Sequence, residues 1–248
     1  MYNPFSLCGK TILITGASSG IGRATALECA KLGANLVITG RNQLKLTDTF
    51  SQLKGNNHLM ISTDLNSENG IELLLSGLRM IDGIVHCAGL IKNLPFQFTT
   101  RKYLDEVMEV NFYAPAEISR RLLKEKKLNK NGSIVFVSSI SGVFCSAVAS
   151  TIYSASKGAV NGLVKGMALD LAPKGIRVNS VNPGVIETGI FESGTITSEQ
   201  LDEDKKHYPL KRFGQPHEVA FAIIYLLSDA SSWVTGSNLV IDGGFTLL

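Results

Sequence analysis

Residues 11–22, "TILITGASSGIG", decide the fold of this chain. The β-branched run "TILIT" predicts a buried strand, and glycines follow it at positions 16, 20 and 22, where a helical pattern begins. Glycines allow a tight turn and leave a surface without Cβ atoms, so that a pyrophosphate can approach the backbone N–H groups and the positive end of the helix dipole. The strand–turn–helix context makes this spacing informative. We therefore expect this segment to bind the phosphates of a dinucleotide.

The rest of the chain repeats the alternation of strand and helix. The predicted strands are mostly continuous apolar runs, as in a parallel sheet that is covered on both faces. They occupy residues 11–15, 35–39, 58–62, 82–86, 133–138, 176–181 and 238–241. With helical stretches between them, they predict an α/β fold with a doubly wound, Rossmann-type parallel sheet of about seven strands. A length of 248 residues fits one dinucleotide-binding catalytic domain over 1–248.

Composition excludes several classes of protein. The net charge of +3 is small, and no basic stripe is interleaved with aromatic residues, which argues against a nucleic-acid partner. The cysteines at 8, 29, 87 and 145 form no CxxC pair, so they predict free thiols in a reducing compartment and no metal site. The first ten residues lack the pattern of a signal peptide, and no apolar run reaches the length of a membrane span. We expect a cytoplasmic protein that does not bind membranes.

The end of the second predicted strand indicates which dinucleotide is bound. An NAD site usually has an acidic residue there that hydrogen-bonds the ribose 2′-hydroxyl. In this chain the stretch "ITGRN" has Gly40 at that position, followed by Arg41. Arg41 can pair with a 2′-phosphate, so NADP(H) is favoured over NAD(H). The alternative is that Arg41 is a solvated loop residue. Asp64, after the third strand, is placed either to hydrogen-bond the adenine or to cap a helix.

Tyr153 and Lys157 are four residues apart in "TIYSASKGAVNG" and lie on one face of a predicted helix. The pKa of tyrosine is about 10, and an ammonium, helped by the charge of an oxidised nicotinamide, can lower it. The pair therefore predicts acid–base chemistry. Ser138 and Ser139 end the fifth strand, at the sheet edge where ligands of this fold bind, and a hydroxyl there can hold a carbonyl oxygen.

Pro115 lies in the middle of a predicted helix that runs over residues 100–127. Proline has no N–H, so the carbonyl of Asn111 loses its helical partner. An ordered water is the expected substitute, and it would carry protons from solvent toward Lys157. The alternative is a simple kink.

These residues together resemble the short-chain dehydrogenase/reductase family over nearly the whole chain. Asn111, Ser139, Tyr153 and Lys157 are similar to its catalytic tetrad; Ser138 stays the alternative serine, because Ser139 implies one extra residue near 144–151. The resemblance implies that Ser139 and Tyr153 bind a carbonyl oxygen, that Tyr153 gives the proton, and that Lys157 lowers its pKa and binds ribose. The expected cofactor-binding residues are Gly16, Ser18, Ser19, Gly20, Ile21, Gly22, Arg41, Asp64, Leu65, Ala88, Gly89, Tyr153, Lys157, Pro183, Gly184, Ile186 and Thr188.

One segment departs from the family pattern. After the fourth strand the family usually has Asn-Asn-Ala-Gly, whereas this chain has His86-Cys87-Ala88-Gly89. Both amides are missing, which affects the hydrogen bonds that brace the strand and the adenosine side. His86 and Cys87 are expected to be strand residues with their own partners, the alternative being a metal or redox site.

Three further features bear on partners. Glycines at 158, 162 and 166 line one stripe of the Tyr153 helix, and the resemblance implies a homotetramer, or a dimer, packed through such helices; the alternative is packing within the chain. Residues 189–210 are expected to form a substrate lid, the alternative being a disordered insertion. A basic cluster near the end of the long predicted helix would bind an acidic carrier protein; the alternative is that its charges only stabilise the helix through its dipole. The cluster comprises Arg120, Arg121, Lys124, Lys126, Lys127 and Lys130.

The sequence thus predicts an NADP-dependent oxidoreductase that transfers a hydride between nicotinamide and a carbonyl or secondary alcohol. Its length and C-terminal motifs resemble 3-oxoacyl-carrier-protein reductases, which implies a small-molecule substrate on a carrier protein. The alternatives are a sugar or polyol dehydrogenase of the same family and a non-catalytic nucleotide-binding sensor or scaffold.

Overall fold

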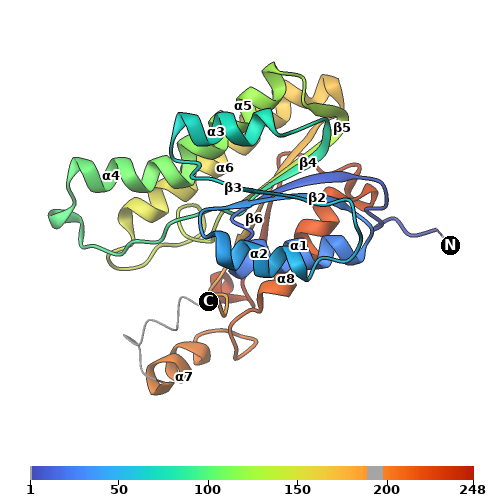
Figure 1. Ribbon diagram of the computed structural model, residues 1–248. Coiled ribbons are helices and arrows are strands. Elements are labelled where there is room, and N and C mark those ends of the chain that lie inside the picture. Colours follow the sequence, from blue (N-terminus) through green and yellow to red (C-terminus); the bar gives the residue numbers. More distant parts are fainter. Residues whose placement is uncertain (1, 189–197) are drawn as a thin grey trace.

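A single parallel sheet forms the centre of the protein. The computed structural model describes residues 2–188 and 198–248, and within them seven strands are ordered β3-β2-β1-β4-β5-β6-β7 (Figure 1). All six neighbouring pairs are parallel. This confirms the predicted doubly wound sheet. The strands are β1 (Thr11–Thr15), β2 (Asn35–Gly40), β3 (Leu59–Ser62), β4 (Ile81–His86), β5 (Leu128–Val137), β6 (Arg177–Pro183) and β7 (Asn238–Ile241).

Every predicted strand is present, but β5 begins five residues earlier than its apolar run. Its first pairing joins Leu128 to Ile81, and the register then shifts before Ser133 pairs with Gly83. The residues between, "NKNG", are polar and read as a turn in the sequence. A bulge keeps them in the strand, which is why the hydrophobic pattern alone missed this part of β5.

Helices cover both faces of the sheet. In Figure 1, α1 (Gly20–Lys31), α2 (Gln43–Ser51) and α8 (Pro216–Leu227) lie below it, and α3 (Glu68–Ser76), α5 (Ala114–Lys124) and α6 (Thr151–Leu171) lie above it. Helices α4 (Arg101–Met108) and α7 (Ser198–Lys206) extend from the carboxyl side of the sheet. The short turns are η1 (Phe96–Phe98), η2 (Glu109–Tyr113), η3 (Ala172–Lys174), η5 (Asp229–Ser231) and η6 (Phe245–Leu247).

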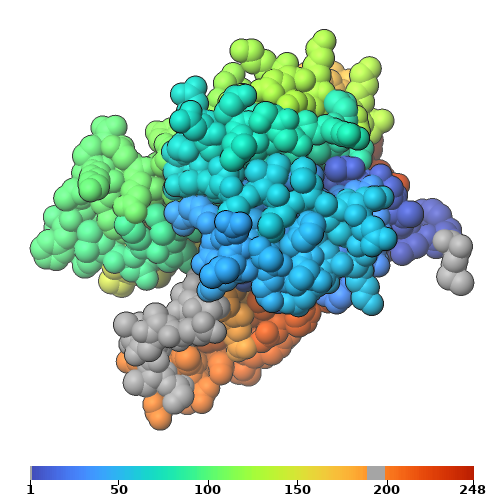
Figure 2. Space-filling view, in the orientation of Figure 1, coloured from blue at the N-terminus to red at the C-terminus, as the bar shows by residue number. Residues whose placement is uncertain are grey.

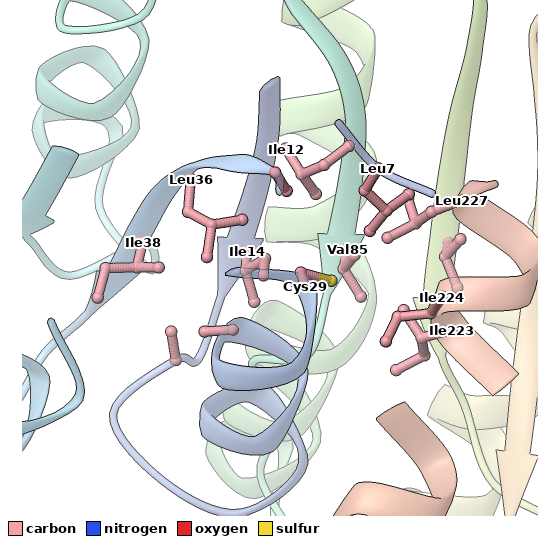
Figure 3. Packing of buried hydrophobic residues seen from close by; sticks show 14 of the residues in the cluster. Leu7, Ile12, Ile14, Cys29, Leu36, Ile38, Val85, Ile223, Ile224 and Leu227 are labelled. Carbon is pink, nitrogen blue, oxygen red and sulfur yellow. The ribbon is translucent and has the colours of Figure 1, made fainter. Parts of the chain in front are cut away.

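The strands are buried on both faces, as their continuous apolar runs predict. Ile12 and Ile14 point into the core shared with α1 and α8, where Figure 3 shows them among apolar side chains that include Leu36 and Val85. Leu13, between them in the strand, packs into the opposite core with α5 and α6. All three strand side chains are at most 1% exposed. Burial of such a side chain stabilises the fold by roughly 1.5–3 kcal/mol.

The carboxyl ends of β1, β4, β5 and β6 meet at one edge of the sheet because the strands are parallel. Figure 2 shows residues near 100 (green) standing apart from residues near 200–210 (orange) beside this edge. Across residues 2–188 and 198–248, none of the helices combines the length and apolar character needed to cross a membrane.

Candidate active site

The turn between β1 and α1 has the geometry of a phosphate cradle. Gly16 and Gly20 adopt φ of +66° and +52°, in the left-handed region that favours glycine. A Cβ at Gly16 would lie 2.7 Å from the backbone nitrogen of Ala88, and one at Gly22 would overlap the carbonyl oxygen of Gly16. Ser19 caps α1 without a side-chain hydrogen bond, so the first N–H groups of the helix have no side-chain acceptor. These features fit an anionic pyrophosphate.

Thr15 braces the segment that lacks the family's two amides. Its hydroxyl oxygen accepts hydrogen bonds from the backbone N–H groups of Cys87 (3.1 Å) and Ala88 (3.2 Å). The last residue of β1 therefore holds the end of β4 against the phosphate turn. The sequence analysis missed this role, because a threonine at a strand end carries no signal of which backbone it will meet.

Thr188 covers the opposite side of the cradle. A Cβ at Gly20 would lie 3.2 Å from its Cγ2 atom. Its hydroxyl oxygen is buried and has no hydrogen-bond partner among the described residues. Ile186 is held by a bridge to Gly214, and Pro183 ends β6 just before Gly184. This orphaned hydroxyl beside the cradle fits a polar group of a bound cofactor, in line with the expected cofactor-binding role of Thr188.

The adenosine end of the predicted site is open. Arg41 is exposed and forms no ion pair with any residue that the structure describes. A Cβ at Gly40 would lie 3.2 Å from the hydroxyl oxygen of Ser18, so strand β2 passes close to the phosphate turn. This arrangement leaves the guanidinium accessible to an added phosphate.

Asp64 does not cap a helix, so that alternative is wrong. The N-cap of α3 is Ser67, whose hydroxyl oxygen accepts the N–H of Gly70. Within the described part of the chain, the exposed carboxylate of Asp64 accepts a single local bond, from the N–H of Asn66 at 3.2 Å, while Leu65 beside it is buried. Its position after β3 keeps Asp64 available to an adenine.

Tyr153 and Lys157 lie on adjacent turns of α6, with the ammonium nitrogen 5.8 Å from the centre of the Tyr153 ring. The same ammonium donates to the carbonyl oxygen of Val137 at 2.8 Å. Ser139 accepts the N–H of Ser141 at 3.1 Å, and its hydroxyl donates toward the Tyr153 phenol. The structure thus brings Ser139, Tyr153 and Lys157 together at the carboxyl edge.

Ser138 faces away from this group. Its hydroxyl donates to the carbonyl oxygen of Lys157 at 3.1 Å and is buried. Ser138 therefore holds α6 against the end of β5, whereas Ser139 contacts the phenol. The geometry favours Ser139 as the serine that meets a substrate.

Burial dominates the electrostatics of the pair. Burial raises the pKa of Tyr153 above its ordinary value, and the hydrogen bond from Ser139 only opposes this effect. Burial also lowers the pKa of Lys157 to about 8. Lys157 therefore stays mostly protonated at neutral pH. In the chain without a cofactor, however, it does not lower the pKa of the Tyr153 phenol toward 7. Desolvation there outweighs a charge 5.8 Å from the ring centre, so the expected lowering of the Tyr153 pKa, which includes the charge of an oxidised nicotinamide, stays a prediction.

The predicted helix over residues 100–127 is interrupted at Asn111. It consists of α4, a π-helical turn, η2, and α5, and the N–H of Ala114 bonds the carbonyl of Glu109, five residues back. Pro115 explains the wide turn, since its ring would clash with the carbonyl four residues back in an α-helix. The predicted break at this proline is confirmed, in the form of a π turn.

The side chain of Asn111 holds the segment after β4. Its amide oxygen accepts the N–H of Leu90 at 2.8 Å, and its amide nitrogen donates to the carbonyl of Leu90 and to the hydroxyl of Ser156 at 3.0 Å each. Ser156 in turn donates to the carbonyl of Tyr153 at 2.7 Å. Asn111 thus links the Leu90 backbone to the Tyr153 helix. Ser156 was absent from the prediction because nothing in the motif distinguishes it from other helical serines.

His86 and Cys87 have partners within the fold. His86 is 4% exposed, stacks on Phe136 at 4.7 Å between ring centres, and has its Nε2 atom 2.9 Å from the hydroxyl oxygen of Ser119. Burial lowers the pKa of His86 to about 3 and raises that of Cys87 to about 12, so both are neutral at physiological pH. The prediction of His86 as a strand residue with its own partner is confirmed.

The glycine stripe of α6 divides into two parts. A Cβ at Gly158 would meet the carbonyl oxygen of Gly142 at 3.4 Å, so this glycine packs within the chain. Gly162 and Gly166 are exposed and have no described atom within 4 Å of an added Cβ. The intrachain alternative therefore explains Gly158 but not the other two.

The predicted lid is only partly described, because residues 189–197 lie outside the described residues. The remainder contains α7 and then Tyr208, which is 4% exposed and whose hydroxyl oxygen accepts the N–H of Val185. A cavity of about 630 Å³ lies among α1, α7 and α8, lined in part by Gly20, Thr188 and Leu201. It adjoins the phosphate cradle and is not lined by Tyr153.

The basic cluster lies at the other edge of the sheet. It surrounds the end of α5 and the start of β5, whereas Tyr153 is at the carboxyl edge. Arg120 pairs with Glu117 at 2.6 Å, and Arg121 pairs with Glu72 and Glu125. This position separates the cluster from the site of the same chain, and neighbouring acids already neutralise part of its charge.

The fold and the site define an enzyme that exchanges hydride between a nicotinamide and a carbonyl or alcohol. The family model of enoyl-(acyl carrier protein) reductases matches residues 16–246. The chain belongs to the short-chain dehydrogenase/reductase family.

Three relatives illustrate the range of this family. The chain is 36% identical to the uncharacterized oxidoreductase YmfI of Bacillus subtilis, over 95% of this chain and 98% of that protein. It is 32% identical to the 3-oxoacyl-[acyl-carrier-protein] reductase FabG of Rickettsia bellii, over 98% and 99%. The crystal structure of a putative NAD(P)-dependent gluconate 5-dehydrogenase from Beutenbergia cavernae, with bound NADP at low occupancy, matches with a TM-score of 0.89 and 30% identity over 99% and 100%.

Proposed function

We propose that the protein is an NADP-dependent reductase of carbonyl groups, with a 3-oxoacyl thioester as its substrate. The observation that carries this proposal is the contact of Ser139 with Tyr153, with the Lys157 ammonium 5.8 Å from the centre of the Tyr153 ring. A protein that only sensed a nucleotide would need the cradle but not a polarised hydroxyl pair at the carboxyl edge. The arrangement therefore favours catalysis over the non-catalytic alternative.

The proposed roles follow from the contacts. Bound NADP(H) supplies or accepts the hydride. Ser139, whose oxygen is held by the N–H of Ser141, donates to the carbonyl oxygen of the substrate. Tyr153 donates the proton to the same oxygen as it becomes an alkoxide, and protonated Lys157 stabilises the resulting phenolate.

The proton lost by Tyr153 must be replaced from solvent. We propose that the backbone carbonyl of Asn111, in the π turn, holds the water through which Lys157 is reprotonated. The π turn supports this role, because the helix is widened at this backbone. The Asn111 side chain also lies near Lys157: a Cβ at Gly89 would lie 3.6 Å from the Asn111 amide oxygen and 3.8 Å from the Lys157 nitrogen.

The preference for NADP(H) rests on Arg41. Strand β2 ends at Gly40, with no carboxylate to hold a ribose 2′-hydroxyl, and the Arg41 guanidinium is exposed beside it. A 2′-phosphate would gain a charge-assisted hydrogen bond there. The relative from Beutenbergia cavernae, which holds NADP, supports the same reading.

Two further proposals concern the state of the protein. The exposed Gly162 and Gly166 allow close approach of another backbone, which supports assembly as a homotetramer, or a dimer, through α6. Residues 189–210 are proposed to close over the substrate. The protein is proposed to act in the cytoplasm, where its free cysteines would stay reduced.

The substrate and cofactor are tested together by the loss of reduced-nicotinamide absorbance with an acetoacetyl thioester. NADPH and NADH are compared in parallel. Rapid oxidation of NADPH alone is the expected result. Rapid use of NADH would remove the role of Arg41. Oxidation of gluconate or glucose with NADP⁺, seen as a gain of the same absorbance, together with no reduction of the thioester, would favour the sugar dehydrogenase alternative.

A further inference from the structure

Two loops beside Tyr153 expose an unusual number of apolar side chains. The first, residues 90–98, follows β4, and the second, residues 140–150, joins β5 to α6; we call them the rim loops. Val148 is 95% exposed, Phe96 63% and Phe98 62%. Ile91, Val143 and Phe144 are also exposed. Single exposed apolar residues are ordinary, but a gathering on two adjacent loops marks a binding surface.

Both rim loops begin at residues of the active site. The first starts at Leu90, whose N–H and carbonyl are both bonded to Asn111. The second starts directly after Ser139 and ends just before α6, in which Tyr153 is the third residue. The approach to the phenol is therefore bordered by these loops.

Hydrogen bonds hold the two rim loops side by side. The N–H of Leu94 donates to the carbonyl of Ala149 at 2.8 Å, and the hydroxyl of Ser150 donates to the amide oxygen of Asn93 at 3.2 Å. Ala149 adopts φ of +63°, which is uncommon for a residue with a Cβ. This turn lies in the segment where Ser139 and Tyr153 are one residue further apart than is common in the family, and it directs the Ala149 carbonyl to the other loop.

Four of the six polar side chains of the rim loops are engaged within the protein, and Gln97 and Ser141 are the two without a hydrogen bond to a described residue. Lys92 is their single charged residue and pairs with Glu106 at 2.6 Å. Ser146 bonds the hydroxyl of Ser154 at 2.9 Å, and Asn93 accepts from Ser150. To bind these loops, a sugar acid would need an unpaired cationic side chain, and a polyol would need several free hydrogen-bond donors and acceptors. A ligand hydroxyl that leaves water without finding a new partner weakens binding.

A hydrocarbon chain suits this surface. Each methylene that is fully removed from water contributes up to about a fourfold factor in affinity. The exposed side chains of Phe96, Phe144 and Val148 supply that contact without requiring hydrogen bonds from the substrate. A polyol on the same surface would gain little from them.

We propose that the rim loops bind an apolar tail of the substrate, so that the enzyme acts on carbonyl compounds with an extended hydrocarbon chain rather than on sugars or polyols. This inference rests on the proposed function, since it assumes that the carbonyl is held by Ser139 and Tyr153. It adds that the remainder of the acyl chain lies along the side chains of residues 91–98 and 143–148.

The test is the dependence of kcat/KM on chain length. 3-Oxoacyl thioesters of N-acetylcysteamine with four, six, eight and ten carbons are reduced with NADPH, and glucose and gluconate are oxidised with NADP⁺ under matched conditions. We expect kcat/KM to rise about tenfold from four to eight carbons, which corresponds to partial burial of four methylenes. Phe144→Ser and Val148→Ser should each flatten this rise, while Leu73→Ser, an exposed apolar position on α3, should leave it unchanged.

The outcomes separate the two proposals. Reduction of the four-carbon thioester without any gain from longer chains would overturn the apolar tail and keep the proposed function. Faster turnover of glucose or gluconate would also overturn it. If the serine variants altered sedimentation but not the chain-length profile, the surface would be a contact between subunits and the inference would fail. Absence of turnover with every carbonyl compound would remove the proposed function and the inference with it.

Discussion

Acidification should destabilise this protein through His86. The imidazole is buried against Phe136, and its Nε2 atom meets the hydroxyl oxygen of Ser119 at 2.9 Å. That hydroxyl already donates its single proton to the carbonyl of Pro115 at 2.9 Å. The Nε2 atom of His86 must therefore carry a hydrogen and donate it, and a second proton would place an imidazolium inside the core.

The magnitude follows from the pKa difference between the folded and unfolded chains. Burial lowers the pKa of His86 from 6.5 to about 3. Below pH 6.5 the unfolded state binds a proton at His86 that the folded state does not bind. The contribution of neutral His86 to the free energy of unfolding is therefore complete above pH 6.5 and is lost as the pH falls toward 3. At pH 5 the loss amounts to about 2 kcal/mol relative to pH 7, at about 1.4 kcal/mol for each unit below 6.5.

Urea unfolding at pH 7 and pH 5 measures this effect in the full chain. His86→Phe keeps an aromatic ring on Phe136 and His86→Asn provides a second replacement; both remove the titrating group. Between pH 7 and pH 5, the free energy of unfolding of each variant should fall by about 2 kcal/mol less than that of the parent protein. His217→Phe, at an exposed position, serves as the control and should retain the parent's loss. Equal losses in the parent and both His86 variants would refute the reasoning.

Three other predictions follow from the site and its surroundings. Gly16→Ala should abolish tight NADPH binding, measured by fluorescence titration, because a Cβ would lie 2.7 Å from the nitrogen of Ala88 at a φ of +66°; binding like that of the parent would show that the turn is not the cradle. Arg41→Ala should raise the KM for NADPH roughly tenfold, for the loss of about 1.4 kcal/mol, and leave that for NADH unchanged; a parallel rise for both cofactors would place Arg41 outside the 2′-phosphate site. Gly162→Leu should shift the assembly to smaller species in analytical ultracentrifugation, since the exposed position has no described atom within 4 Å; an unchanged distribution would move the subunit contact elsewhere.

Much of the fold was predictable because its determinants are local. Continuous apolar runs mark strands that are covered on both faces, and glycines at 16, 20 and 22 mark a tight turn in which Gly16 lies close to Ala88 and Gly22 lies close to Gly16. The same local character made the break at Pro115 predictable, since a missing N–H has the same consequence in any helix.

Other features depend on contacts between distant segments. The bracing by Thr15, the carbonyl of Val137 as acceptor of Lys157, and the link from Asn111 to Ser156 arise only when β1, β4, β5 and α6 meet at one edge. Spacing along the chain gives no measure of desolvation, which is why the rise in the pKa of Tyr153 was not anticipated. The role of Asp64 was left open between the adenine and a helix cap, because the sequence did not show that Ser67 would cap α3.

The most direct test of the account compares turnover with cofactor binding in Tyr153→Phe, using Tyr225→Phe on α8 as the matched control. The account predicts that Tyr153→Phe reduces an acetoacetyl thioester at least about a hundredfold more slowly, the usual contribution of a positioned general acid, while its affinity for NADPH stays close to that of the parent. Tyr225→Phe should match the parent in both measurements. Undiminished turnover by Tyr153→Phe would contradict the claim that this phenol is the proton donor.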